Sequence, residues 1–123
     1  MSTVAHDVTK RVYDTIVVAG GVGSQVLPDG MAHELLQIIV VPPTIASTYK
    51  FYIQDTKDSI KVFEREEVIT GQYNELLVPT LPLWGNNTFY LYGASNGTYK
   101  LRIVYRWVTK ALPEYVTMLG MIL

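Results

Sequence analysis

The sequence predicts an all-β fold, a single antiparallel β-sandwich or jelly-roll of about seven or eight short strands. Segments rich in β-branched and aromatic residues recur along the chain, and turn residues such as Gly, Pro, Asn and Asp separate them. No long amphipathic helix interrupts this pattern. At 123 residues the chain has the length of one domain and can bury a core without a metal or a disulfide bond.

The chain divides into three parts. Residues 1–9 have no hydrophobic periodicity and are expected to form a flexible N-terminal arm. Residues 10–110 hold the predicted strands of the sandwich domain. Residues 111–123 are mostly apolar, which is unusual for a chain end and predicts burial, either as a last strand in the chain's own core or against a neighbouring subunit. A membrane-surface anchor is the weakest alternative, because the segment has few basic residues.

The first predicted strand covers residues 10–19, which are rich in Val, Ile and Tyr. The glycine-rich residues 20–23 then predict a flexible loop, and the Pro-Asp-Gly sequence at 28–30 predicts a turn. Residues 34–41 are apolar on both faces and predict a buried strand, with a short helix over 32–37 as the alternative.

A hairpin is expected in the middle of the chain. Residues 49–55 alternate between two faces, residues 55–59 form a turn rich in Asp and Ser, and residues 60–65 return with the same alternation. Residues 68–70 continue the second strand across a bulge.

The next segments are shorter. Residues 76–78 predict a strand that ends at Pro79, and a loop containing Trp84 follows Pro82. All six prolines are placed in or next to loops in this scheme.

Two strands complete the prediction. Residues 88–92 form one, and Asn96 with Gly97 predicts the tight turn of a hairpin. Residues 99–107 show the clearest alternation, with Tyr, Leu, Ile and Trp on one face and mainly Lys and Arg on the other.

Composition limits the possible functions. Cysteine is absent, which excludes disulfide bonds, cysteine-ligated zinc, iron–sulfur clusters and thiol catalysis. The 10 basic and 11 acidic residues give a net charge of −1, so we expect neither nucleic acid nor membrane as a partner. The N-terminal residues lack the apolar region of a secretory signal, and the mean hydropathy of +0.18 suggests apolar surface covered by partners.

No catalytic, metal or cofactor site is predicted. His6 lies in the predicted arm and His33 enters an apolar strand, where an interface or strand-edge position is expected. Ser24 lacks the flanking pattern of a nucleophile elbow. Glu64 and Glu66 have basic neighbours and are expected on a solvated surface. The glycines at 20–23 lack the spacing of a nucleotide-binding loop. We therefore expect a protein that is not an enzyme and that binds no cofactor.

A basic row is expected on the strand at 99–107. With tyrosines on nearby strands it could stack single-stranded nucleic acid, but the net charge favours a solvent face or an acidic subunit as partner. The residues concerned are Lys100, Arg102 and Arg106, with Tyr52, Tyr90 and Tyr92.

The all-β pattern, the absence of cysteine, the short arm, the Trp84 loop and the sequence GTYKLRIVYRW at 97–107 together resemble the small jelly-roll cement, or decoration, proteins of tailed bacteriophages. The resemblance covers residues 10–108 and is architectural. It implies a non-enzymatic protein of the virion, assembled in the host cytoplasm, that binds the major capsid protein or other virion proteins and stabilises the shell. It also implies a homo-oligomer.

A cement protein needs exposed apolar anchors and extended chain ends. The expected contacts are Leu83 and Trp84 together with the tail residues Tyr115, Met118, Leu119, Met121, Ile122 and Leu123. The alternative is a carbohydrate-binding module or a sugar-binding spike domain that uses Trp84, Tyr90 and Tyr92 as stacking surfaces.

Overall fold

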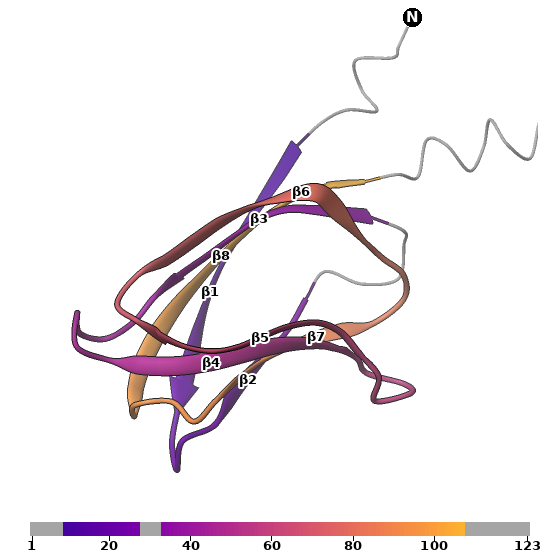
Figure 1. The fold of residues 1–123 in the computed structure, drawn as a ribbon. Helices are drawn as coiled ribbons and strands as arrows, with labels where there is room; N and C mark the ends of the chain where they lie inside the picture. Colours follow the sequence, from indigo (N-terminus) through magenta and orange to yellow (C-terminus); the bar gives the residue numbers. More distant parts are fainter. Residues whose placement is uncertain (1–8, 28–32, 108–123) are drawn as a thin grey trace, which may run out of the picture.

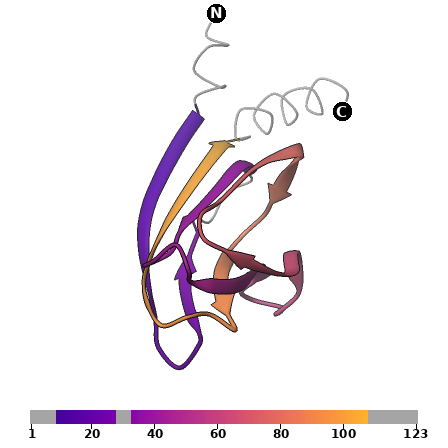
Figure 2. The ribbon, with the colours of Figure 1, turned by 60° about the vertical axis from the view of Figure 1, so that its left-hand side comes forward.

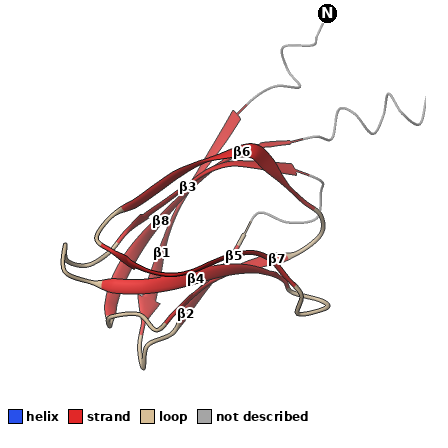
Figure 3. Ribbon diagram, in the orientation of Figure 1, coloured by secondary structure: helices blue, strands red, loops and turns tan. Residues whose placement is uncertain are grey.

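The computed structural model describes residues 9–27 and 33–107, and this part of the chain contains strands and no helix. The strands are β1 (Thr9–Val18), β2 (Gly23–Val26), β3 (His33–Val41), β4 (Thr48–Asp55), β5 (Lys61–Thr70), β6 (Tyr73–Leu83), β7 (Asn87–Tyr92) and β8 (Gly97–Trp107). Figure 3 shows the strands and the short loops that join them. The predicted all-β fold class is confirmed.

The strands form two antiparallel sheets of four strands each. Sheet 1 has the order β1-β8-β3-β6, and sheet 2 has the order β2-β7-β4-β5. The two sheets face each other as a sandwich, which is clear when Figures 1 and 2 are compared. β1 and β2 are consecutive in the chain but belong to different sheets, and so do β5 and β6. The chain therefore crosses between the layers at both edges of the sandwich.

Alternating apolar residues from the two inner faces build the core. In β4, Tyr49, Phe51 and Ile53 are fully buried, and Phe51 stacks on Phe89 of β7 with ring centroids 4.9 Å apart. Tyr49 also contacts Tyr99 of sheet 1 edge to face at 5.4 Å. This contact joins the two sheets through the middle of the sandwich.

The predicted hairpin at 49–65 is confirmed, since β4 pairs with β5. Its turn forms as expected, because the Asp55 side chain accepts hydrogen bonds from the amides of Lys57 and Asp58 at 2.8 and 3.1 Å. The register between β4 and β5 shifts between Tyr49 and Phe51, so the predicted bulge in the second strand is present.

The prediction of a flexible loop at 20–23 was wrong in part. Gly20 and Gly21 have φ angles of 65° and 83° and form the turn, but Gly23 begins β2, which pairs with β7. A strand of four residues with polar members gives little periodicity, and this explains why the sequence did not indicate it. The helix alternative over 32–37 is also wrong where the structure describes it, since β3 begins at His33.

β6 is longer than the predicted strand at 76–78, and it continues through Pro79 and Pro82. The placement of these two prolines in or beside loops was therefore wrong. β6 lies at the edge of sheet 1 and pairs with β3 alone, and prolines within sheets are confined largely to such edge strands, where one side of the backbone has no strand to bond.

The turn at Asn96 and Gly97 does not close a hairpin. β7 pairs within sheet 2 and β8 within sheet 1, so the connection carries the chain from one layer to the other. Gly97 has a φ angle of 137°, and a Cβ atom there would lie 2.7 Å from Cγ of Pro43. The glycine is needed for this crossing rather than for a two-residue turn.

Some predictions lie outside the described residues: the arm as far as residue 8, the turn at 28–30, and the tail at 111–123. Thr9, which was assigned to the arm, begins β1 and pairs with Arg106. The alternation predicted for 99–107 is confirmed at four positions of the apolar face, which are buried: Tyr99, Leu101, Ile103 and Tyr105.

Candidate interaction surfaces

Four strand ends of sheet 1 gather at one end of the sandwich. His33, which begins β3, pairs with Leu83 at the end of β6 and with Trp107 at the end of β8. Thr9, which begins β1, pairs with Arg106. Trp84 follows β6 directly, so we call this region the Trp84 end. It lies at the upper right of the sandwich in Figure 1.

Trp84 is a large exposed side chain on an anchored backbone. Its exposed fraction is 63%, and its carbonyl accepts a hydrogen bond of 3.0 Å from Nδ2 of the buried Asn87. Leu83, the preceding residue, is 2% exposed and packs in the core. Leu83 therefore offers no exposed surface to a partner, contrary to the anchor role expected for it. Its buried side chain instead fixes the end of β6, from which the Trp84 loop begins. The contact role of Trp84 stays a prediction, and the tail residues from Tyr115 to Leu123 lie outside the described residues.

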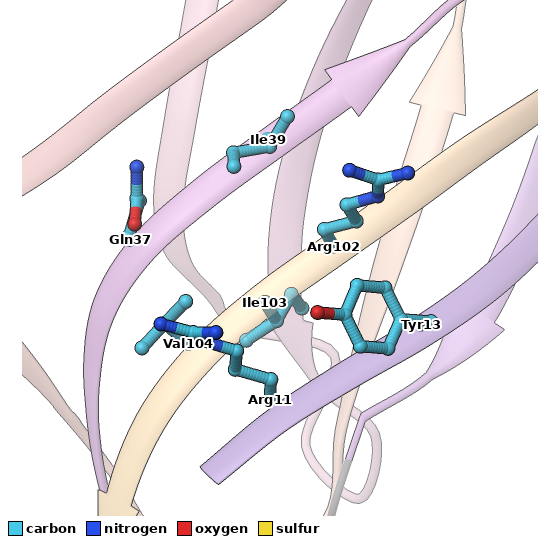
Figure 4. Close-up of a pocket in the computed structure, with 7 residues that line it drawn as sticks. All are labelled: Arg11, Tyr13, Gln37, Ile39, Arg102, Ile103 and Val104. Atoms are coloured by element: carbon cyan, nitrogen blue, oxygen red, sulfur yellow. The ribbon is translucent and has the colours of Figure 1, made fainter. Parts of the chain in front are cut away.

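The outer face of sheet 1 is both basic and apolar. Tyr13 lies beside Arg102, whose guanidinium carbon is 5.4 Å from the ring centroid. Arg11 and Lys100 are exposed on the same face, and we call these four residues the basic face. A hollow of about 230 Å³ is lined by Arg11, Tyr13 and Arg102 of this face together with Gln37 and Ile39 of β3, and Figure 4 shows these side chains.

The cations of the basic face form no ion pair with any carboxylate that the structure describes. Among residues 9–27 and 33–107, no ion pair includes Arg11, Lys100 or Arg102. Asp14 shares a second hollow with Lys100 but forms no ion pair with it in this part of the chain. Exposed cations beside an aromatic ring and aliphatic side chains are typical of a surface that binds a protein partner with acidic groups.

Arg106 belongs to a different group. Its guanidinium donates to Oε1 of Glu34 at 3.2 Å, and the Thr80 hydroxyl donates to Oε2 of the same carboxylate at 2.5 Å. The Thr80 hydrogen bond and the Arg106 charge lower the pKa of Glu34, against the opposing effect of burial. These contacts connect β8, β3 and β6 next to the Trp84 end.

The predicted combination of a basic row with tyrosines on nearby strands was wrong. Tyr52, Tyr90 and Tyr92 belong to β4 and β7 of sheet 2, whereas Lys100, Arg102 and Arg106 belong to β8 of sheet 1. The sequence did not indicate that Arg11 and Tyr13 would be the neighbours of Arg102. The signal was present in the alternation of residues 10–19, but strand pairing cannot be deduced from alternation alone.

The three tyrosines of sheet 2 contact one another and two lysines. Tyr52 stacks on Tyr90 at 4.9 Å, and Nζ of Lys61 lies 4.6 Å from the Tyr52 centroid. β4 lies between β7 and β5, so Tyr90 and Lys61 approach the Tyr52 ring from opposite sides. A sugar that stacks on Tyr52 would have to displace one of them. Among the described residues, Trp84 makes no ring contact with these tyrosines.

Glu64 is part of the same surface. Its carboxylate accepts hydrogen bonds from Lys61 at 3.0 Å and from the Tyr92 hydroxyl at 3.1 Å. The bond to Lys61 lowers the pKa of Glu64 and raises that of Lys61. This is an internally paired group of side chains.

His33 is 1% exposed and lies in β3, between β8 and β6. It is therefore in the sheet interior, which corrects the expected strand-edge position, and its ring meets that of Tyr105 at 5.4 Å. Within the described ranges, no group of three or more His, Cys, Asp or Glu residues could hold a metal ion. No helix of the described chain is long and apolar enough to cross a membrane.

Comparisons with known proteins add information on the fold. No protein-family model matches the sequence, and no curated protein matches it significantly. The solved NLP core of Drosophila, a structure reported for its insight into pentamer formation and histone binding, has a TM-score of 0.51 and 11% identity. The match covers 80% of this chain and 96% of that one. At this identity the similarity extends to the sandwich fold and not to a function.

Two further solved structures are more distant. The capsid structure of Helicobacter pylori bacteriophage KHP30 has a TM-score of 0.46 at 11% identity and covers 84% of this chain and 90% of that one. The carbohydrate-binding module CBM36 has a TM-score of 0.37 at 9% identity and covers 76% and 77%. Neither similarity indicates a function for this chain.

Proposed function

We propose that this chain is a non-enzymatic structural protein of a virus particle, which works by binding other protein subunits. The observation that carries the proposal is the Trp84 end. There a tryptophan that is 63% exposed sits on a hydrogen-bonded loop, next to the strand ends from which the predicted arm and tail continue. An exposed tryptophan is a typical centre of a protein–protein interface.

The specific form of the proposal is a cement, or decoration, protein on the capsid exterior. In this role the Trp84 end faces the major capsid protein, and the apolar residues 115–123 add to the contact. Many copies on one shell supply avidity, so each contact can be weak and still stabilise neighbouring capsomers. The resemblance of the sequence to such proteins supports this role, and the proposal includes assembly into the virion in the host cytoplasm.

The proposal is tested by sedimentation of the native protein from its source lysate, with and without nuclease. We expect it to travel with particles of megadalton mass and to remain there after nuclease treatment. A protein that stays at the mass of a monomer or small oligomer would contradict the proposal. A glycan-binding screen would then test the carbohydrate-binding alternative.

A variant identifies the surface. We expect Trp84→Ala to reduce particle binding by about tenfold or more, because large aromatic anchors supply much of an interface's binding energy. Ile45→Ala is the matched control, since Ile45 is 91% exposed and follows the opposite end of β3. Equal losses from both variants would argue against the Trp84 end as the docking surface.

A further inference from the structure

The basic face has a counterpart on the opposite sheet. In β5, Arg65 pairs with Phe51 and Ile69 pairs with Tyr49, so three residues lie opposite Lys50 alone. The strand bulges here, and Glu66, Glu67 and Val68 are all exposed. We call these three residues the β5 ridge.

The β5 ridge is acidic. Among the described residues, no ion pair includes Glu66 or Glu67, whereas the neighbouring Glu64 is bound to Lys61. β5 is the edge strand of sheet 2, so the ridge also lies beside a strand edge that no other described strand covers. Val68 is 60% exposed and gives the ridge an apolar component.

The chain therefore separates its charges. The net charge is only −1, yet among the described residues cations without an ion pair gather on the outer face of sheet 1 and carboxylates without one gather at the edge of sheet 2. These surfaces belong to opposite layers of one rigid sandwich and cannot meet within one molecule. Two complementary surfaces on a nearly neutral protein favour association between copies.

We infer that the basic face binds the β5 ridge of a second copy of this chain. The contact is heterologous, because two different surfaces meet, and repeated contacts of this type give a ring or an open chain of copies. The hollow of about 230 Å³ beside Tyr13 and Ile39 provides a concave surface on which the exposed side chains of the bulge can pack. The inference deepens the proposed function, on which it rests, by naming one partner of the structural protein: its neighbouring copy.

Charge exchange tests the contact. The purified full chain is studied by sedimentation velocity in three forms: a face variant (Arg11→Glu with Arg102→Glu), a ridge variant (Glu66→Lys with Glu67→Lys), and a swap variant with all four changes. We expect the face and ridge variants to self-associate about tenfold more weakly or worse, because close charge pairs in interfaces contribute strongly. The swap variant restores association, since the two signs are again complementary.

The matched control is Lys57→Glu, which reverses one positive charge in the exposed turn between β4 and β5, as each substitution of the face variant does on the basic face. It is expected to associate as the wild type does, and circular dichroism confirms that each variant is folded. Raising the salt concentration weakens wild-type association, as expected for a contact between charges.

Three results would overturn the inference. They are a wild-type chain that is monomeric at every concentration, face and ridge variants that associate normally, or a swap variant that stays monomeric while folded. A face variant that loses retention on single-stranded DNA but not self-association would instead assign the basic face to nucleic acid. Trp84→Ala separates the two proposals when it is studied by both particle co-sedimentation and sedimentation velocity, because it is expected to weaken docking on the particle and to leave self-association intact.

Discussion

At the scale of single residues, neighbours in the chain have different roles that depend on backbone geometry. Leu83 is 2% exposed and Trp84 is 63% exposed, although one follows the other. The pleat of β6 turns Leu83 into the core, and the loop that follows releases Trp84 to the surface. Backbone geometry also decides the role of Gly23, which begins β2 where the chain packs closely against β1.

Gly23 provides a prediction at this scale. A Cβ atom at this position would lie 2.8 Å from both Cγ2 of Ile16 and the carbonyl oxygen of Val17. The carbonyl belongs to the backbone and cannot move aside cheaply, so we expect Gly23→Ala to lower the free energy of unfolding by about 1–3 kcal/mol. Ser24→Ala, at the next and exposed position, is the control and should change it little. Urea denaturation of both variants measures the difference, and equal stability would show that β2 can move away from β1.

At the scale of the strands, side chains connect the edge strand β5 of sheet 2 to the edge strand β6 of sheet 1. β5 and β6 belong to different sheets, and no backbone ladder joins them. The Arg65 guanidinium of β5 bonds to the Glu75 carboxylate of β6, and its Nε donates to the Tyr73 hydroxyl at 3.0 Å. Arg65 also lies over the Phe63 ring at 4.4 Å. One side chain thus closes this side of the sandwich.

We expect Arg65→Ala to lower the free energy of unfolding by about 1 kcal/mol or more, because it leaves the half-buried Glu75 without its cation. Lys61→Ala is the comparison, since Lys61 also forms an ion pair but within one strand and in solvent, where such pairs contribute little. Thermal unfolding at neutral pH ranks the two variants. A larger loss for Lys61→Ala would contradict the role of Arg65 as the connection between the sheets.

At the scale of the whole molecule, two tyrosines join the layers. Tyr49 of sheet 2 and Tyr99 of sheet 1 are fully buried, and their rings meet edge to face. Their hydroxyl groups donate to the carbonyl oxygens of Gly71 and Ser95 at 2.6 and 2.7 Å. Burial raises the pKa of both tyrosines above the ordinary value of 10.0.

This burial predicts sensitivity to alkaline pH. A raised pKa in the folded state means that the stabilisation is complete below pH 10.0 and is lost as the pH rises, because only the unfolded chain ionises readily there. We expect the free energy of unfolding to fall above about pH 10, and to fall less steeply in Tyr49→Phe, which has no proton to lose at this site. Denaturation between pH 8 and about 11 measures the slope.

The same variant has a cost at neutral pH. Tyr49→Phe leaves the Gly71 carbonyl without its donor and should lower stability by about 1–2 kcal/mol. Tyr90→Phe on the outer face of sheet 2 is the control and should be close to the wild type. If Tyr49→Phe left the free energy of unfolding unchanged, another donor would have to reach the Gly71 carbonyl in the core.

The fold class and most of the strands could be predicted from the sequence. Alternation places Tyr49, Phe51 and Ile53 in the core, and the same rule holds for Tyr99, Leu101 and Ile103. These signals are local, because a strand with one buried face needs an apolar residue at every second position. The turn at Asp55 was predictable for the same reason, since its hydrogen bonds connect residues that are close in sequence.

Which strands are neighbours could be seen only in the folded structure. Alternation shows that Arg102 points outward, but only the pairing of β1 with β8 places Tyr13 beside it, and only the separation of β7 from β8 moves Tyr90 to the other sheet. Strand pairing depends on contacts between residues far apart in the chain, and a pattern of period two is compatible with many such pairings. The core residues of this protein can therefore be predicted from its sequence, whereas the residues that share a surface depend on which strands pair.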